Sequence, residues 1–236
     1  MKYLIVDNRI TPACELSLLK EGFSLLKLPA DPTLGQAVAS HPDTVLFYDE
    51  GEIITTADYC DAAAYIFTDI REAIPDVRIT FTSDVRTDRY PKDCIMNVLK
   101  IGNHLYCKTD TVSRAILELA KARGYEIIHT NQGYPACSVL AFGKSAITAD
   151  QGLADCMAKN GVRVTLIRNK GISLPPYEYG FIGGASGVVG RKIYFFGDIS
   201  THPDCDKILR AIEKEGFIPH SLSSEGLTDL GGIIPL

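Results

Sequence analysis

A single cysteine is the residue best placed for nucleophilic chemistry. Cys137 follows the turn-forming segment Gly133-Tyr134-Pro135 and stands directly before an apolar run. A thiolate there, its pKa lowered by neighbouring charge, could attack an amidine or acyl carbon. Free cysteine is also among the most buried residue types, so a purely structural role for Cys137 stays open.

One histidine and two carboxylates could assist this nucleophile. His202, which precedes Pro203, could act as a general acid or base. Asp93 or Asp150 could orient a substrate cation through charge-assisted hydrogen bonds. Each residue also has a structural interpretation, because His202 stands at an expected helix start and Asp150 fits a helix N-cap.

Polar residues and glycines around Cys137 are candidates for ligand binding. The segment from Tyr177 to Gly190 holds five glycines and lacks the apolar alternation of a typical strand. Glycine at such positions indicates the close approach of a ligand or a neighbouring strand. The candidate ligand-binding residues are Asn131, Gln132, Tyr134, Ser138, Tyr179, Gly183, Gly184 and Asp198.

These candidates lie within a pattern that recurs along the whole chain, which is typical of repeat architectures. A short apolar run that ends in aspartate occurs five times, at Asp7, Asp58, Asp110, Asp150 and Asp198. A helical pattern follows each aspartate, so we expect the aspartates to be helix N-caps. Four of the helices are expected to end at a glycine in the left-handed conformation, at Gly22, Gly124, Gly161 and Gly216. The remaining helix ends before Pro75.

Two further strands are expected after each helix. The first set comprises residues 23–28, 77–81, 125–129, 162–167 and 217–220, and the second set comprises residues 44–48, 94–99, 138–142, 183–190 and 231–234. A unit of strand, helix, strand and strand cannot bury its own apolar face, so the units must pack on one another. We expect one α/β domain over residues 1–236, with units 1–51, 52–103, 104–144, 145–191 and 192–236.

Composition narrows the classes of function. A hydrophobic content of 46% with 22% charged residues is typical of a globular protein with a sizeable core. A net charge of −5 without a basic stripe argues against a nucleic-acid partner. No signal peptide or membrane-spanning segment is evident, and seven cysteines without paired spacing predict neither disulfides nor a zinc site. We expect a cytoplasmic protein with no cofactor and no metal.

Five such units around a pseudo-fivefold axis resemble the pentein fold, a five-bladed α/β propeller. Arginine and agmatine deiminases, dimethylarginine dimethylaminohydrolase, amidinotransferases and the ribosome anti-association factor share this fold. Three segments also resemble an uncharacterised clostridial-type pentein-like family: Asn131 to Ser138, Ala146 to Asp150, and Tyr179 to Ala185. The resemblance implies a ligand site in a central channel, where equivalent positions of the five units meet.

The catalytic motifs of pentein hydrolases fit this chain only in part. The resemblance implies a cysteine nucleophile on the last inner strand after paired glycines, but Pro235 stands at about that place. The glutamate implied before paired glycines is absent ahead of Gly183-Gly184, and no inner-strand histidine is evident. Lys92-Asp93 resembles the acidic motif that holds a guanidinium group. The segment around His202 faintly resembles a histidine motif of agmatine deiminases.

Two functions from different classes remain open, and a third is less consistent with the sequence. The first is an enzyme acting on guanidine or amidine groups, with its site displaced to Cys137, His202 and Asp93, which requires Cys137 and His202 to meet across the channel. The second is a non-catalytic pentein that binds a small polar molecule or a partner protein. A doubly wound nucleotide-binding protein would not explain the third strand of each unit, and residues 7–12 lack its glycine motif.

Overall fold

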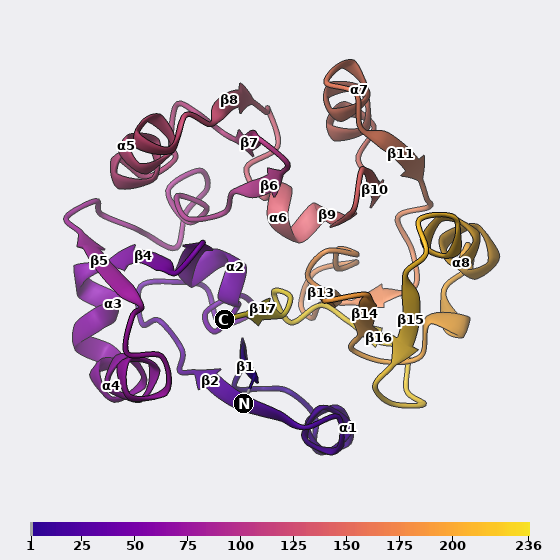
Figure 1. Ribbon diagram of the computed structural model, residues 1–236, viewed down its shortest axis with the longest axis horizontal. Helices are drawn as coiled ribbons and strands as arrows, with labels where there is room; N and C mark the ends of the chain where they lie inside the picture. Colours follow the sequence, from indigo (N-terminus) through magenta and orange to yellow (C-terminus); the bar gives the residue numbers. More distant parts are fainter. Residues whose placement is uncertain (1) are drawn as a thin grey trace.

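The computed structural model describes residues 2–236, whose strands form six small sheets. Five of these sheets have three strands, and one has two. In each three-stranded sheet, the middle strand is parallel to one neighbour and antiparallel to the other. Figure 1 shows the five larger sheets placed around a common centre, with the longer helices on the outside.

The three-stranded sheets share one order of elements. The middle strands are β1 (Lys2–Asp7), β4 (Glu52–Thr56), β7 (His104–Cys107), β10 (Ser145–Thr148) and β14 (Lys192–Phe195). The helices that follow them are α1 (Pro12–Lys20), α3 (Ala57–Ala62) with α4 (Ala64–Ala73), α5 (Arg114–Arg123), α7 (Gln151–Lys159), and the 3-10 helix η1 (Ile199–Thr201) with α8 (Cys205–Lys214). The parallel partners, here called the outer strands, are β2 (Phe23–Leu28), β5 (Arg78–Thr82), β8 (Glu126–His129), β11 (Arg163–Leu166) and β15 (Ile218–Ser221).

The antiparallel partners, here called the inner strands, lie nearer the common centre. They are β3 (Leu46–Asp49), β6 (Leu99–Ile101), β9 (Val139–Phe142), β13 (Ser186–Val189) and β17 (Ile234–Pro235). Short helices α2 (Pro42–Val45) and α6 (Pro135–Ser138) precede β3 and β9, and β12 (Ile172–Ser173) pairs with β16 (Leu227–Thr228). Four inner strands pair with the middle strand that follows them in sequence, whereas β17 pairs back with β1.

Glycine marks the ends of helices as the sequence predicts. Gly22, Gly124, Gly161 and Gly216 all have φ between +70° and +86°, a conformation that glycine adopts without steric penalty. Each leads into an outer strand that begins within two residues. The outer strands are therefore predicted almost to the residue.

The aspartates at the ends of the middle strands are caps in only two cases. The Asp150 carboxylate accepts a hydrogen bond from the Leu153 amide at the start of α7, and the Asp198 carboxylate accepts one from Ser200 in η1. The other three helices have Thr11, Thr56 and Ser113 at the N-cap instead. The prediction is wrong for Asp7, Asp58 and Asp110. Extra residues separate Asp7 and Asp110 from the helix that follows, whereas Asp58 lies inside the first turn of α3, and a hydroxyl residue takes the cap position in each case.

Residues 94–98 form turns rather than the predicted strand, which is limited to β6. The amide of Asn97 donates to the carbonyl of Cys94 at 2.9 Å, which closes a turn. The Asn97 side chain then donates to the backbone carbonyl of Asp43 and accepts from the amide of Ala136. Asn97 therefore links the segments before three inner strands, and its hydrogen bonds favour a turn over an extended strand.

Each buried apolar cluster is shared by two neighbouring sheets. Leu28 of β2 packs in one cluster with Ile53 of β4 and Phe67 of α4. The other four clusters join the remaining neighbours in the same way, the last of them linking Leu4 of β1 with Tyr194 of β14. Burial of apolar area against the next sheet is therefore what holds the units together.

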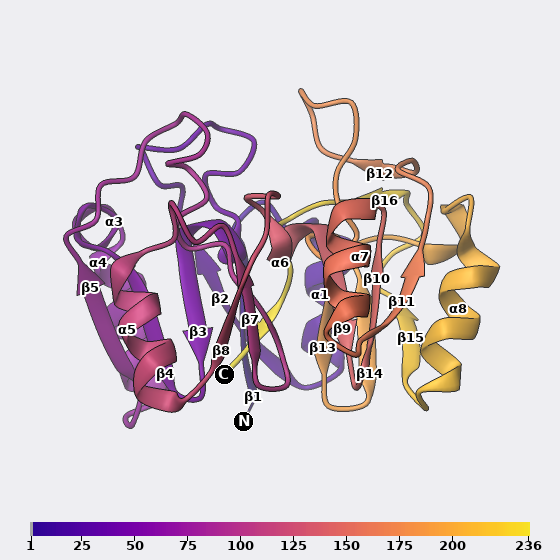
Figure 2. The ribbon, with the colours of Figure 1, turned by 90° about the horizontal axis from the view of Figure 1, so that it is seen from above.

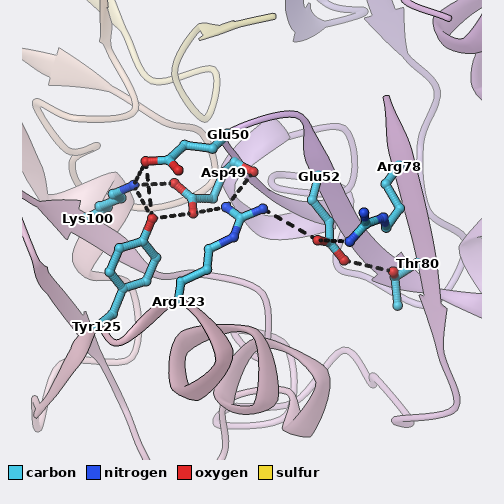
Figure 3. A network of polar contacts seen from close by, with 8 residues as sticks. All are labelled: Asp49, Glu50, Glu52, Arg78, Thr80, Lys100, Arg123 and Tyr125. Carbon is cyan, nitrogen blue, oxygen red and sulfur yellow. Dashed lines mark hydrogen bonds and ion pairs between the residues drawn. The ribbon is translucent and has the colours of Figure 1, made fainter. Parts of the chain in front are cut away.

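A polar network reinforces the junction between the β3–β4 turn and the following sheet (Figure 3). The Lys100 ammonium lies 2.5 Å from an Asp49 carboxylate oxygen, and the Tyr125 hydroxyl donates to the same carboxylate at 2.9 Å. The Arg123 guanidinium pairs with Asp49 and with Glu52. Partial burial opposes ionisation of Asp49, but the three donors hold its pKa below the ordinary value.

No helix in the described part of the chain, residues 2–236, combines the length and apolar character needed to span a membrane.

Candidate functional site

A cavity of about 590 Å³ is lined by segments from all five units. Its lining residues are Val38, His41, Asp88, Tyr90, Asp93, Gln132, Tyr134, Cys137, Leu174, Tyr177, Glu178, Tyr179, Phe181 and Asp229. Most lie in the loops that lead into the inner strands, so the common centre of the sheets gathers them. A cavity of this size suits a small molecule.

Four of the lining residues occupy equivalent positions. His41, Tyr134, Phe181 and Asp229 each stand five residues before the first residue of an inner strand, namely β3, β9, β13 and β17. The equivalence follows from the shared order of elements, because corresponding residues of the units then lie at the same point before their inner strands. Alignment of the units on their inner strands is the sequence signal that identifies His41 and Asp229.

A buried cysteine, histidine and aspartate meet at this cavity. One atom each of Cys137 (the thiol sulfur), His41 (a ring nitrogen) and Asp229 (a carboxylate oxygen) lie within 4.8 Å of one another. The three residues are 3%, 0% and 1% exposed. His41 lies at the N-cap of α2, before β3 and not on an inner strand, and the sequence did not single it out as a site residue.

His41 lies between two carboxylates. Its Nδ1 is 3.8 Å from Oδ1 of Asp229, and its Nε2 is 3.8 Å from Oδ2 of Asp7. Both separations exceed a hydrogen bond, and neither ring nitrogen has a hydrogen-bond partner among residues 2–236. A buried polar atom without a hydrogen-bond partner is unfavourable, and both ring nitrogens of His41 are in this condition.

Cys137 is held in place by backbone and side-chain contacts. It lies in the short helix α6, which begins at Pro135, and not at the start of a strand as expected. The amide of Gly184 donates to the carbonyl of Cys137 at 2.9 Å. The Asn97 side-chain nitrogen lies 3.5 Å from the Cys137 sulfur. The proline-initiated turn of helix therefore aims the thiol at the cavity while its backbone is fixed by the neighbouring inner segment.

Burial shifts the protonation equilibria of the side chains in this cluster. Burial raises the pKa of the Cys137 thiol well above its ordinary value, and the nearby carboxylates of Asp43 and Asp229 raise it further. Burial lowers the pKa of His41 to about 3. Burial also raises the pKa of Asp43 to about 8 and that of Asp229 to about 6. Burial therefore favours the neutral thiol of Cys137, the neutral imidazole of His41 and the protonated form of Asp43.

Asp93 presents a second carboxylate to the cavity. The Tyr134 hydroxyl donates to one Asp93 oxygen, and the other oxygen is buried without a partner among the described residues. Burial and the Asp93 charge raise the pKa of Tyr134, which keeps its hydroxyl a donor. Asp93 and Cys137 thus line one cavity, as the proposed substrate-orienting role requires.

The lining is strongly acidic and aromatic. It contains four carboxylates, from Asp88, Asp93, Glu178 and Asp229, and no lysine or arginine within the described chain. The rings of Tyr90, Tyr134, Tyr177, Tyr179 and Phe181 complete the wall. Carboxylates bind cations directly, and aromatic faces attract them through their quadrupole.

The structure does not bring His202 to Cys137. His202 lines a separate cavity of about 540 Å³ together with Asp204, Cys205 and Arg210. Its Nδ1 accepts a hydrogen bond from the amide of Asp204 at 3.0 Å, at the start of α8. The structural interpretation of His202 as a group at a helix start fits this geometry.

The other candidates are distributed around the cavity. Gln132 and Tyr134 line it, Tyr179 lies at its exposed edge, and Asn131 lines a neighbouring cavity of about 430 Å³. Ser138 is buried and lines none of these cavities; Asp150, which lines the cavity beside Asn131, and Asp198 cap helices.

The paired glycines of the fourth unit allow close approach. A Cβ on Gly183 would lie 2.2 Å from the carbonyl oxygen of Ala136, and a Cβ on Gly184 would lie 1.9 Å from a carboxylate oxygen of Asp229. The predicted close approach is therefore to the neighbouring segment and to Asp229. Gly183 also lines a smaller cavity of about 200 Å³ beside Asp43.

Comparison with known proteins establishes family and fold. A family model described as a family of unknown function, DUF6873, matches residues 5–234. A search of curated proteins finds no match.

Solved structures of guanidine-modifying enzymes are similar over nearly the whole chain. An inosamine-phosphate amidinotransferase of Streptomyces griseus aligns with a TM-score of 0.60 and 13% identity, covering 98% of this chain and 91% of that one. A dimethylarginine dimethylaminohydrolase of Pseudomonas aeruginosa complexed with citrulline aligns at 0.58 and 9%, covering 94% and 92%. An amidinotransferase of the saxitoxin pathway of Microseira wollei aligns at 0.57 and 12%, covering 94% and 88%. These proteins are penteins, so the predicted resemblance is confirmed at the level of the fold.

Proposed function

We propose that this chain, which belongs to the family DUF6873, is a hydrolase or transferase that acts on the guanidinium or amidinium group of a small molecule. The observation that carries the proposal is a buried thiol, imidazole and carboxylate within 4.8 Å of one another, in a cavity with four carboxylates and no lysine or arginine among its described lining residues. The five sheets would be the blades of a closed α/β propeller, in a cytoplasmic protein.

Cation binding is the first step. Asp229 and the unpartnered oxygen of Asp93 would hold the planar cation against Cys137. A positive charge next to the thiol lowers the thiol pKa, which burial and carboxylates otherwise raise. In this proposal the thiolate therefore forms when the cationic substrate is bound.

The covalent step uses Cys137 and His41. The thiol proton passes to the neutral His41 imidazole as the sulfur bonds to the central carbon of the amidinium. The resulting imidazolium, which lies beside Asp229, returns the proton to the leaving nitrogen as the carbon–nitrogen bond breaks. Water or an acceptor amine then attacks the same carbon and releases the thiol.

A matched pair of electrophiles tests this proposal. Chloroacetamidine carries an amidinium beside its reactive carbon, whereas chloroacetamide is neutral and of the same size. We expect chloroacetamidine to label Cys137 at least tenfold faster at pH 7.5, measured by peptide mass spectrometry, and His41→Asn to remove the advantage. Equal labelling by the two reagents would exclude a cation-activated thiol.

A non-catalytic ligand-binding role is the second candidate. The raised pKa of the Cys137 thiol favours it, because an un-ionised thiol is a weak nucleophile. This candidate predicts that guanidinium compounds bind without release of ammonia, urea or amine, and that Cys137→Ala binds them as well as the natural chain does.

A further inference from the structure

The side-chain amide of Asn97 is held in one orientation by two backbone groups. Its Oδ1 accepts a hydrogen bond from the amide of Ala136 at 2.8 Å, and its Nδ2 donates to the carbonyl of Asp43 at 3.0 Å. A backbone amide can only donate and a carbonyl can only accept, so these two bonds determine which end of the Asn97 side chain is nitrogen. Asn97 is 1% exposed, so the protein and not the solvent sets this orientation.

The second hydrogen on Nδ2 of Asn97 is directed to the thiol of Cys137. Nδ2 lies 3.5 Å from the Cys137 sulfur and donates a hydrogen bond to it. Figure 2 shows α6, the helix that carries Cys137, on the side of the sheets away from the chain termini. Asn97 reaches this helix from the turn before β6. A buried N–H donor is therefore in place at the sulfur.

The other groups beside the thiol do not stabilise a negative charge on the sulfur. The carboxyl groups of Asp43 and Asp229 raise the pKa of the Cys137 thiol, as burial does, whereas the hydrogen bond from Asn97 lowers it. Burial favours the neutral form of the third neighbour, His41. A hydrogen bond to an ionised acceptor is stronger than one to a neutral acceptor, and burial increases the difference. The hydrogen bond from Asn97 therefore strengthens when the thiol loses its proton.

Resting on the proposed function, we propose that Asn97 is a further catalytic residue, whose side-chain N–H stabilises the thiolate of Cys137. As the thiol proton passes to His41, the charge left on the sulfur faces this donor. Asn97 forms no covalent bond and exchanges no proton. Because the donor is fixed before the charge appears, it stabilises the thiolate without reorganisation.

Rates of alkylation test this role. Asn97→Leu has a side chain of similar size that carries no donor and no charge. We expect chloroacetamide to label Cys137 about three- to tenfold more slowly in this variant at pH 7.5, since loss of a hydrogen bond to an ionised group lowers the thiolate fraction while the remaining thiolate is more nucleophilic. The slowing should be equal for chloroacetamidine, because the variant does not alter the charge of the site.

Thr148→Val is the matched control. The buried Thr148 hydroxyl donates to the carbonyl of Ser138 at 2.9 Å, so this variant also loses a buried hydrogen bond next to Cys137, but not one to the sulfur. It should label as fast as the natural chain. If Asn97→Leu labels as fast as Thr148→Val, the role of Asn97 is wrong, while a preference of the natural chain for chloroacetamidine still supports the proposed function. If that preference is absent, the proposed function fails, and the slowing with chloroacetamide still decides the role of Asn97.

A measurement on the natural chain decides the question if Asn97→Leu does not fold. The pH range in which the thiolate of Cys137 forms is given by the difference in ultraviolet absorbance between the natural chain and Cys137→Ala. We expect the side-chain amide protons of Asn97 to shift downfield over the same range in NMR spectra, and not to shift in Cys137→Ala. Amide protons that stay unchanged in the natural chain, or that shift equally in both proteins, would overturn the role of Asn97.

Discussion

Nδ1 of His41 lies 3.8 Å from Oδ1 of Asp229, although the two residues precede the first and the last inner strand of the chain. Gly231 makes this approach possible. Its φ is +68°, and a Cβ there would lie 2.3 Å from the Cβ of His41. The juxtaposition of imidazole and carboxylate therefore depends on a backbone that carries no side chain at this point.

Burial of neutral His41 makes the protein lose stability in acid. The folded state holds His41 with a pKa of about 3, against 6.5 for an exposed imidazole. Between these values the unfolded chain binds more protons, so the free energy of unfolding falls as pH falls from about 6.5. Between pH 7 and 4.5, we expect the free energy of unfolding of His41→Gln to fall by about 2 to 3 kcal/mol less than that of the natural chain, as measured by urea unfolding.

His129, an exposed histidine of β8, provides the control. His129→Gln should keep the natural slope of stability against pH. A His41→Gln protein with the same acid slope as the natural chain would contradict burial of a neutral His41.

Asp43 has the opposite effect at higher pH. Its folded pKa of about 8 lies above the ordinary 3.8, so between these values the folded state binds more protons and stability falls as pH rises. From pH 5 to 7.5, we expect the free energy of unfolding of Asp43→Asn to rise by about 3 kcal/mol relative to that of the natural chain. Urea unfolding at the two pH values checks the gain, and Asp61→Asn should show none.

The buried pair of Arg86 and Asp31 anchors the segment that carries His41. The Arg86 guanidinium pairs with Asp31 and donates to the carbonyls of Thr44 and Val45, at the end of α2. We expect Arg86→Met to lower the free energy of unfolding by about 3 to 5 kcal/mol, because it leaves Asp31 buried without a counter-ion.

The double variant Arg86→Met/Asp31→Asn should lose less than the sum of the single variants, because no unpaired charge remains. Arg78→Met is the matched control, since Arg78 is 76% exposed in its ion pair with Glu52, and its expected loss is under about 1 kcal/mol. Additive single losses, or equal losses for Arg86 and Arg78, would argue against this anchoring role.

Gly184 leaves the space that Asp229 occupies. Gly184→Ala should lower stability by about 1 to 3 kcal/mol through overpacking and, by displacing Asp229, slow the labelling of Cys137 by chloroacetamidine. Gly35→Ala is the control, because no atom lies within 4 Å of a Cβ there, and its expected change is within about 0.5 kcal/mol. Unchanged labelling of Gly184→Ala would show that Asp229 is not needed in its present place.

The outer strands could be predicted from sequence because local signals mark them. Gly22 and its counterparts end each helix in the left-handed conformation, and an apolar strand follows at once. The N-caps were not predicted as well as the outer strands. The aspartates and the hydroxyl residues Thr11, Thr56 and Ser113 stand within a few residues of each other, and both types can cap a helix. Turn residues such as Asn97 act through contacts with distant segments, which no local pattern records.

Part of the candidate site could also be predicted from local features of the sequence. Cys137 and Asp93 stand out by residue type and line the cavity. His41 stands in a loop before Pro42, and Asp229 in a loop before Leu230, where neither has a local signal of chemistry. His202 lies beside a proline in the same way but in a unit position that faces another cavity. Position within the unit, and not residue type, decides which side chains reach the centre.

The pairing of β17 with β1 has a consequence for synthesis of the protein on the ribosome. The segment that carries Asp229 emerges after the segments that carry His41 and Cys137, and domains form from the N-terminal side during translation. A nascent chain can therefore stack its first sheets, but it has no partner for the free edge of β1 and no complete reactive cluster. The cluster of Cys137, His41 and Asp229 is therefore completed only when the last strand docks on β1.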